Sequence, residues 1–173
     1  MSPATGGSEV AQSDPQSPVI DGRSFTNYDT IFIHGAMAGV NPALPGVRYE
    51  GNSPDGYTLQ LIPSTPSVYV TCPFVSYNSK QGGIQPRARY LGLEYMTSGA
   101  EIFRIDVYNG HSFIQTIDYN PPIGSTTYTV KVIDLGAWYR FDRGLGMCLF
   151  TRNPSSTYDG FINIGGYGAR YEW

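Results

Sequence analysis

Strict alternation of apolar and polar residues between Arg89 and Asp118 constrains the fold more than any other feature of the sequence. Apolar side chains recur at every second position in two neighbouring runs, namely Leu91, Leu93 and Tyr95, and then Phe103, Ile105 and Val107. A period of two is typical of β-strands with one buried face and one wet face. Similar runs recur along the chain, and no long window keeps a helical pattern free of Gly or Pro. The sequence therefore predicts an all-β fold.

The two alternating runs are joined by Thr97-Ser98-Gly99-Ala100, a sequence suited to a tight turn. A register that places Leu93 opposite Ile105 buries both apolar rows on one face. The same register places Glu94 opposite Arg104 on the other face, where opposite charges attract. We therefore predict that these two runs pair as a hairpin within one sheet.

A third strand is predicted after Asn109-Gly110, which is typical of hairpin turns. When His111 is counted into the loop, Phe113 falls opposite Val107 and the apolar rows stay aligned. That arrangement requires a bulge at the turn glycine. The segment is therefore expected to form a meander of three strands.

Short alternating runs separated by Gly- and Pro-rich turns continue to the end of the chain. This spacing favours two packed antiparallel sheets, a β-sandwich of the jelly-roll or immunoglobulin-like type with no substantial helix. A chain of 173 residues is ordinarily one domain. We predict that residues 23–173 form this domain and that residues 1–22, rich in Ser, Pro, Gly, Gln and Asp, form an extended or disordered arm.

Three local features refine this expectation. Pro73 interrupts an alternating run and cannot donate a ladder hydrogen bond, which favours an edge strand or a bulge. Residues 134–143 contain Trp138 and are expected to form a loop packed on the core. The run Gly165-Gly-Tyr-Gly precedes no helix and contains no Lys, so we interpret its glycines as strand and turn glycines rather than as a phosphate-binding loop.

Charge and hydropathy disfavour several classes of partner. The formal net charge is −3, so no electrostatic argument favours nucleic acid. No run approaches the roughly 18 apolar residues of a membrane-spanning helix, so membrane insertion is not expected. The N-terminus has neither the basic opening nor the apolar stretch of an intact signal peptide. An extracellular or assembled setting is nevertheless favoured over the cytoplasm.

Tyrosine is abundant, with 14 residues, whereas charged residues make up only 14% of the chain. A surface poor in Lys and Glu but rich in Tyr is typical of an interface or a ligand-contact surface. Tyrosine is also favoured at half-buried strand positions. The sequence leaves both interpretations open.

Few residues suit catalysis or metal binding. His34 and His111 lack a second His or a Cys at ligand spacing, so neither a metal site nor a cofactor is expected. We interpret His34 as a polar residue that closes a strand and His111 as a turn residue. Cys72 and Cys148 have no neighbouring base for nucleophilic catalysis, and two free buried thiols are favoured over a disulfide.

The candidate ligand or interface residues of the expected meander are Tyr90, Glu94, Arg104, Asp106 and Tyr108. In the predicted register they share one outer face, with flat rings beside acceptors and a forked donor. That mixture suits a sugar, whose faces are apolar and whose rims carry hydroxyls, and it suits a flat protein interface equally well. In a third interpretation the face simply packs against loops of the second sheet. Glu94 and Asp106 could also form a glycosidase carboxylate pair, but Arg104 opposite Glu94 would keep that acid ionised.

From these observations we predict a non-enzymatic β-sandwich that acts by binding. The first hypothesis is self-assembly into a homo-oligomer, filament or shell, with residues 1–22 contacting a neighbouring subunit. The alternative is a carbohydrate-binding module or lectin that binds a glycan through the outer face of the meander. A glycoside hydrolase is the third hypothesis.

Four stretches of the sequence resemble an uncharacterised bacterial family of small β-sandwich domains. They are His34-Gly35, Leu91 to Tyr95, Ile102 to Gly110 and Gly144 to Leu149. The resemblance covers most of the chain after residue 30 and implies the fold. It brings no catalytic residues with it, and residues 1–22 depart from the family pattern.

Overall fold

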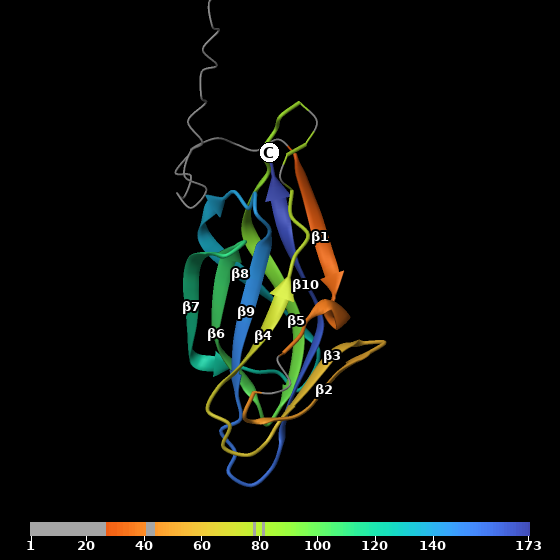
Figure 1. The fold of residues 1–173 in the computed structure, drawn as a ribbon, viewed down its shortest axis with the longest axis vertical. Coiled ribbons are helices and arrows are strands. Elements are labelled where there is room, and N and C mark those ends of the chain that lie inside the picture. Colours follow the sequence, from red (N-terminus) through yellow and green to blue (C-terminus); the bar gives the residue numbers. More distant parts are fainter. Residues whose placement is uncertain (1–26, 41–43, 78, 81) are drawn as a thin grey trace, which may run out of the picture.

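The structure is a computed structural model that describes residues 27–40, 44–77, 79–80 and 82–173. The elements in chain order are β1 (Tyr28–His34), η1 (Gly35–Met37, a 3-10 helix), β2 (Val47–Ser53), β3 (Gly56–Leu61), β4 (Val68–Pro73), β5 (Arg87–Ser98), β6 (Glu101–Asn109), β7 (Ser112–Ile123), β8 (Thr129–Tyr139), β9 (Leu145–Arg152) and β10 (Gly160–Glu172) (Figure 1). The all-β prediction is confirmed. No helix in the described ranges has the length and hydropathy that crossing a membrane would require.

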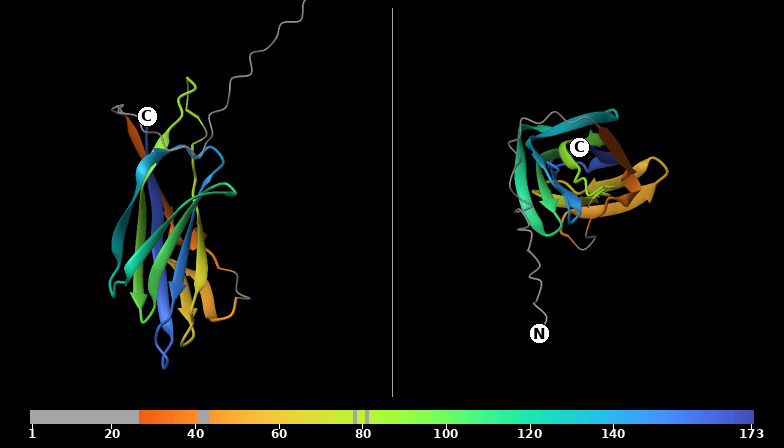
Figure 2. Two further views of the ribbon diagram at one scale, coloured as in Figure 1. Left: turned by 90° about the vertical axis from the view of Figure 1, so that its left-hand side faces the viewer. Right: turned by 90° about the horizontal axis from the view of Figure 1, so that it is seen from above.

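The strands form two antiparallel sheets. The large sheet has six strands in the order β2-β3-β10-β5-β8, and β1 pairs with β10 beside β3. The small sheet has four strands in the order β4-β9-β6-β7. Figure 2 shows the sheets as two layers, with the apolar core between them. The predicted two-sheet antiparallel sandwich is therefore confirmed, whereas the predicted arm, residues 1–22, lies outside the described residues.

The predicted hairpin between β5 and β6 is wrong. β5 pairs with β10 and β8 in the large sheet, while β6 pairs with β7 and β9 in the small sheet. The turn at Gly99, whose φ is 72°, carries the chain from one sheet to the other. Leu93 and Ile105 are both fully buried in the core, but they belong to opposite layers. The alternation still identifies which faces are buried. Leu93 and Ile105 would face the core whether their strands paired in one sheet or packed across two sheets.

A bulge in β6 changes the predicted apolar row. The register shifts between Ile102 and Arg104. As a result Ile102 is buried in the core at 0% exposure, whereas Phe103 turns outward and is only partly buried. Ile105 and Val107 keep the predicted inward orientation.

The predicted hairpin between β6 and β7 is confirmed, but its register differs. Asn109 pairs with Ser112, so the turn residues are Gly110 and His111, and the bulge lies beyond the turn, between Tyr108 and Val107. The Asn109 side chain is buried at 0% exposure. It donates to Asp142 at 2.9 Å and accepts from the Arg143 backbone at 2.9 Å. These tertiary contacts hold Asn109 inside the strand rather than in the turn.

Three further expectations can be compared with the strands. β4 lies at the edge of the small sheet and ends at Pro73, as predicted. Residues 134–143 were expected to form a loop, but β8 continues through Trp138 to Tyr139. The glycine-rich run near the C-terminus belongs to β10, the strand that pairs with β1, β3 and β5. Its glycines are therefore strand glycines rather than part of a phosphate-binding loop.

The tyrosines fall into both predicted groups. Tyr57, Tyr167 and Tyr171 are among the largest fully buried side chains of the core. Tyr28 and Tyr158 are 65% and 61% exposed. The abundance of tyrosine therefore reflects the core as well as the surface.

Candidate functional site

The five candidate residues from the sequence do not share one face. Tyr90 and Glu94 point outward from β5 on the large sheet, because Leu91 and Leu93 point inward. The other three candidates lie on β6, on the outer side of the small sheet. The predicted pair between Glu94 and Arg104 does not form, and the proposed carboxylate pair of Glu94 and Asp106 is split between the two sheets. The reason is the same crossover that separates β5 from β6.

A groove crosses the outer face of the large sheet. One row of cross-strand partners runs from Phe32 on β1 through Gly168 on β10 and Gly92 on β5 to Val132 on β8. The two central residues have no side chain; the Phe32 ring lies over Gly168, and the row is hollow between that ring and Val132. The cavity has a volume of about 480 Å³, and its lining also includes Tyr90. We call this feature the Gly92 groove.

Glycines seat the Phe32 ring against the sheet. A Cβ atom on Gly168 would lie 2.7 Å from Phe32 Cδ2, and a Cβ on Gly166 would collide with the same ring. Phe32 therefore lies over the backbone of β10, yet the side chain remains 51% exposed. At Gly92 the nearest atom to a Cβ would be Phe32 Cε2 at 3.7 Å, which is an ordinary contact. The floor beside the ring is thus open at Gly92.

Hydrogen-bonding side chains border the Gly92 groove at one end. The neighbouring row contains Thr30, Arg170, Tyr90 and Asp134 in register. Arg170 is paired with Glu172 at 2.8 Å. Asp134 accepts from Arg89 at 2.6 and 2.8 Å, and these hydrogen bonds hold its pKa below the usual range. The charges at this end are therefore compensated within the protein.

In the next row on the opposite side, His34 and Glu94 flank Gly166, and the partner of Glu94 on β8, Val130, lines the groove. His34 closes β1, as predicted, and its Nδ1 accepts a hydrogen bond from the Ala36 backbone N–H at 3.2 Å. Its Nε2 lies 3.0 Å from the Pro54 carbonyl oxygen, so the ring is held at the end of the strand. The groove is therefore bordered by polar side chains at one end and by Val130 at the other.

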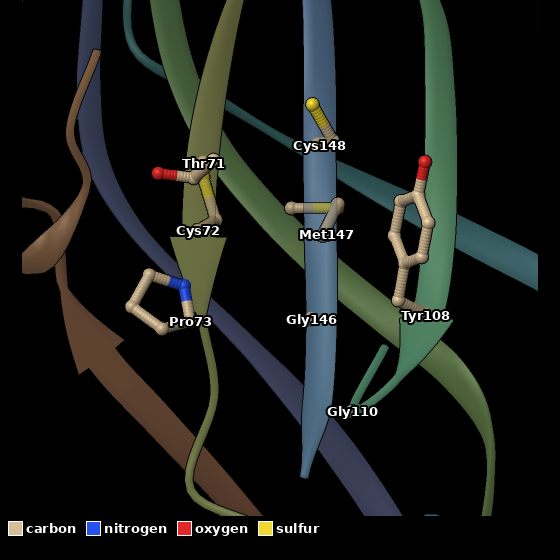
Figure 3. Close-up of a pocket in the computed structure, with 8 residues that line it drawn as sticks. All are labelled: Thr71, Cys72, Pro73, Tyr108, Gly110, Gly146, Met147 and Cys148. Atoms are coloured by element: carbon tan, nitrogen blue, oxygen red, sulfur yellow. The ribbon is translucent and has the colours of Figure 1, made fainter. Parts of the chain in front are cut away.

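A second recess lies on the outer face of the small sheet. Pro73 on β4, Gly146 on β9 and Tyr108 on β6 form one row of cross-strand partners, and Figure 3 shows Pro73 and Tyr108 on either side of β9. The cavity has a volume of about 380 Å³, and its lining also includes Thr71 and Cys148. We call this feature the Gly146 recess.

Asp106, the cross-strand partner of Cys148, is not available for proton transfer. It is 3% exposed and accepts from Arg104 at 2.7 and 2.8 Å and from Thr116 at 2.7 Å. Burial alone would raise the pKa of Asp106, but these hydrogen bonds outweigh burial and lower it. Burial, together with the nearby Asp106 carboxylate, raises the pKa of Tyr108. Asp106 therefore stays ionised and fully engaged by its neighbours.

The thiols are not activated. Both cysteines are free, as predicted, although Cys148 is only partly buried. Burial, with a smaller effect of Asp106, raises the pKa of Cys148 to about 11. At neutral pH the thiol is therefore protonated and a poor nucleophile. Among the described residues, no group of three or more His, Cys, Asp or Glu side chains could hold a metal ion.

The sequence missed most of the Gly92 groove. Phe32, Gly92, Val132 and Gly168 come from four strands that are far apart in the chain. The sequence of a single strand contained one relevant signal: Gly166 and Gly168 are two residues apart on β10 and therefore share a face. Nothing in the sequence indicated which ring would cover them.

No known protein-family model and no curated protein matches this sequence. Solved structures with similar folds include a carbohydrate-binding module, CBM36, in complex with calcium and xylotriose, at 14% identity and a TM-score of 0.42, covering 78% of this chain and 98% of that one. A CBM35 from Paenibacillus barcinonensis is 10% identical with a TM-score of 0.43, covering 80% and 97%. A Stig cyclase from Fischerella sp. TAU is 11% identical with a TM-score of 0.43, covering 94% and 92%. At these values the likeness carries no argument about ligand or reaction, so function must be argued from the side chains of this chain.

Proposed function

We propose that this protein is a non-catalytic glycan-binding β-sandwich whose sugar site is the Gly92 groove. One observation carries the proposal: the half-exposed Phe32 ring lies on a glycine floor, and that floor continues, uncovered, at Gly92. Sugar rings have an apolar C–H face and a hydroxyl rim, so they suit a flat apolar surface bordered by polar groups.

The size of the groove fits a sugar ring. Phe32 and Val132 are three strands apart in their row, which corresponds to about 14 Å between their Cα atoms at the usual strand spacing. The Phe32 ring covers the part of this width above Gly168, and the part above Gly92 carries no side chain. A sugar ring laid against Phe32 and over Gly92 would displace weakly held water from apolar surface, which favours binding.

The polar groups at the Tyr90 end of the groove favour an uncharged sugar. Tyr90 and Thr30 line the groove and offer hydroxyls that can bond to sugar hydroxyls. The cations Arg170 and Arg89 are already paired with carboxylates. A uronic acid or a sulfated sugar would have to compete with those pairs. Neutral hexose or pentose chains are therefore the expected ligand class.

The proposal that the protein is not an enzyme is supported by the arrangement of the candidate acids. Glycosidases place two carboxyl groups about 5–10 Å apart around the scissile bond. Glu94 and Asp106 belong to different sheets and point to opposite outer faces. Asp106 is also held ionised by Arg104. The candidate pair therefore gives no support to the hydrolase hypothesis.

The test is a screen of the full chain against neutral polysaccharides, followed by two matched substitutions. We expect Phe32→Ala to weaken binding at least about tenfold, equivalent to about 1.4 kcal/mol. Tyr158→Ala removes a ring that is 61% exposed in a loop outside the groove, and it should leave affinity unchanged. Absence of binding to every neutral glycan, or equal affinity of both variants and the wild type, would contradict the proposal.

Self-assembly stays a prediction from the sequence. The segment expected to contact a neighbour, residues 1–22, lies outside the described residues. Its test is the native molecular mass by light scattering, with and without that segment. A mass of one chain in both cases would count against self-assembly and leave the glycan proposal unaffected.

A further inference from the structure

Gly92 and Gly146 share an unusual property. Each is a strand glycine without positive φ, and an added Cβ would meet nothing closer than 3.7 Å at Gly92 and 3.9 Å at Gly146. The other strand glycines within the described ranges either have positive φ or would bring a Cβ to within 3.0 Å of a neighbouring atom. Those glycines are explained by backbone shape or close packing. Gly92 and Gly146 are not.

Glycine in a strand interior weakens the strand, because it has no side chain to pack and has more conformational freedom to lose on folding. A glycine in a strand interior often marks a bulge, a tight bend or a place where a ligand or another backbone approaches closely, and neither Gly92 nor Gly146 lies at a register shift. The two open glycines lie on different sheets, on β5 and β9. Each lies beside an aromatic residue of its own face, Phe32 for Gly92 and Tyr108 for Gly146.

The Gly146 recess has the width of a slot for one ring. Pro73 and Tyr108 are two strands apart in their row, or about 9.6 Å between Cα atoms at the usual spacing. A ring held between two apolar surfaces needs about 3.5–4.0 Å on each side. The recess of about 380 Å³ at Gly146 therefore has room for one six-membered ring between Pro73 and Tyr108.

The charge of the recess points to the same ligand class as the groove. The Asp106 carboxylate is compensated by Arg104, and Thr71 offers a hydroxyl that also bonds the Gly39 carbonyl at 3.0 Å. The lining therefore presents apolar surface and hydroxyl groups without an uncompensated charge. An anionic or cationic ligand would find no free counter-charge here, whereas a neutral sugar needs none.

We propose that the Gly146 recess is a second sugar site, so that one protein molecule binds two glycan chains on its opposite faces and cross-links them. The inference rests on the proposed function of the Gly92 groove. The two sites lie on the outer faces of two packed sheets, which are stacked about 10 Å apart at their backbones. One continuous sugar chain therefore does not follow a direct path between them, and each site engages its own chain.

Two matched substitutions separate the sites. Gly92→Val and Gly146→Val each place a branched side chain on the floor of one site, and both positions have room for the added Cβ. Valine is favoured in strands, so neither variant should unfold the protein. Thermal unfolding of both variants verifies this. Tyr108→Ala, which removes a wall of the recess without filling it, provides a second test of the same site.

Binding of the full chain is measured first to xylan, β-glucan, galactan and mannan. It is then measured to the hexasaccharide of the polysaccharide that binds most tightly. Calorimetry should give two sites per chain for the wild type and one for either valine variant, with no binding for the double variant. The wild type should precipitate the polysaccharide, and each valine variant should lose precipitation while still binding. Tyr108→Ala should weaken the second site at least tenfold.

The results distinguish this inference from the proposed function. One site per chain, with Gly146→Val indistinguishable from the wild type, would overturn the second site and leave the groove intact. Precipitation that survives in Gly146→Val would assign cross-linking to self-association, which light scattering without glycan would detect. A wild type that binds none of the four polysaccharides or their oligosaccharides would overturn both.

Discussion

Phe32 on β1 and Gly168 on β10 are direct cross-strand partners, and the Phe32 ring occupies the place that a side chain on Gly168 would need. A Cβ on Gly168 would lie 2.7 Å from Phe32 Cδ2 and even closer to the Ile31 carbonyl oxygen. The exposed ring is thus held against the sheet by the absence of a side chain on its neighbour. This pairing creates the aromatic wall of the Gly92 groove.

Substituting Gly168 should destabilise the fold, whereas substituting Gly92 should not. Gly168→Val forces the Phe32 ring and the β1 backbone away, and overpacking of this kind costs about 1–3 kcal/mol. Gly92→Val meets no such obstacle and should leave the free energy of unfolding unchanged or slightly higher. Urea denaturation of both variants measures the difference. Equal stabilities would show that the ring does not need the glycine beneath it.

Asp106 should contribute to stability in a pH-dependent way. Burial alone would raise its pKa, but the hydrogen bonds from Arg104 and Thr116 leave the folded-state pKa lowered, below the unfolded value of about 3.9. Such a group stabilises the fold above the unfolded pKa, and this contribution is lost as pH falls through the folded value.

We therefore expect Asp106→Asn to be less stable at pH 7 by about 1–3 kcal/mol and to lose less stability on acidification below about pH 4. Urea midpoints from pH 2 to 7 measure both effects. Asp118→Asn, at an exposed position opposite Arg104, is the matched control and should change little. An acid profile of Asp106→Asn parallel to that of the wild type would contradict the assignment.

Cys148 should react slowly with thiol reagents. Because burial raises its pKa to about 11, only about one thiol in a thousand is ionised at pH 8. The labelling rate should rise about tenfold per pH unit up to about pH 10, and Cys148→Ser should abolish it. Cys72 is 1% exposed and should not contribute in the native state. Fast, stoichiometric labelling at pH 7 would show that the thiol is activated.

Lys80 should hold the two ends of the described chain together. Its Nζ lies 3.5 Å above the Trp173 ring, 4.5 Å from the Tyr77 ring centre and 3.3 Å from Asp29. The ammonium is thus attracted by two ring faces and a carboxylate. We expect Lys80→Ala to increase hydrogen exchange at the backbone pair between Asn27 and Trp173.

The control for this prediction is Lys131→Ala. Lys131 Nζ lies 5.4 Å from the Tyr119 ring centre. Lys131 belongs to β8, which is separated from β1 by β10 and β5 in the large sheet. This variant should leave exchange at the chain ends unchanged. If both lysine variants gave the same exchange at Trp173, the contact with Lys80 would have no role in holding the C-terminal residue.

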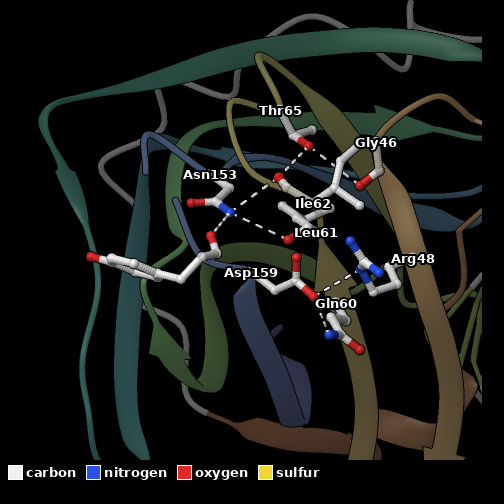
Figure 4. A network of polar contacts seen from close by, with 9 residues as sticks. Gly46, Arg48, Gln60, Leu61, Ile62, Thr65, Asn153 and Asp159 are labelled. Carbon is white, nitrogen blue, oxygen red and sulfur yellow. Dashed lines mark hydrogen bonds and ion pairs between the residues drawn. The ribbon is translucent and has the colours of Figure 1, made fainter. Parts of the chain in front are cut away.

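Asn153 should be a structural residue of the loops at the far end of the sandwich. Its amide donates to the carbonyls of Leu61, Ile62 and Tyr158 at 3.3, 3.1 and 2.9 Å (Figure 4). The side chain is 1% exposed, so Asn153→Ala leaves buried carbonyls without their donor and should cost about 1–3 kcal/mol. Thermal unfolding checks this against Ser156→Ala, an exposed position of the same loop, which should change little.

The sequence predicted the strands because alternation depends only on which residues must be buried. The inward positions of Leu93, Tyr95 and Ile105 follow from the period of two alone, and all three are buried. The edge position of β4 follows from the missing N–H of Pro73. These properties are local, so no knowledge of partners was needed.

The partners of each strand were decided only by the tertiary structure. Leu93 and Ile105 are buried equally well side by side in one sheet or in opposite sheets, so alternation cannot distinguish a hairpin from a crossover. The same ambiguity explains why Glu94 and Arg104 were predicted to share one face. In the fold they lie on different sheets. The Gly92 groove depends on register among four strands that are distant in the chain, with Phe32 meeting Gly168 only after β1 has paired with β10. The glycines themselves are visible in the sequence, but their cross-strand partners are set only when the strands pair.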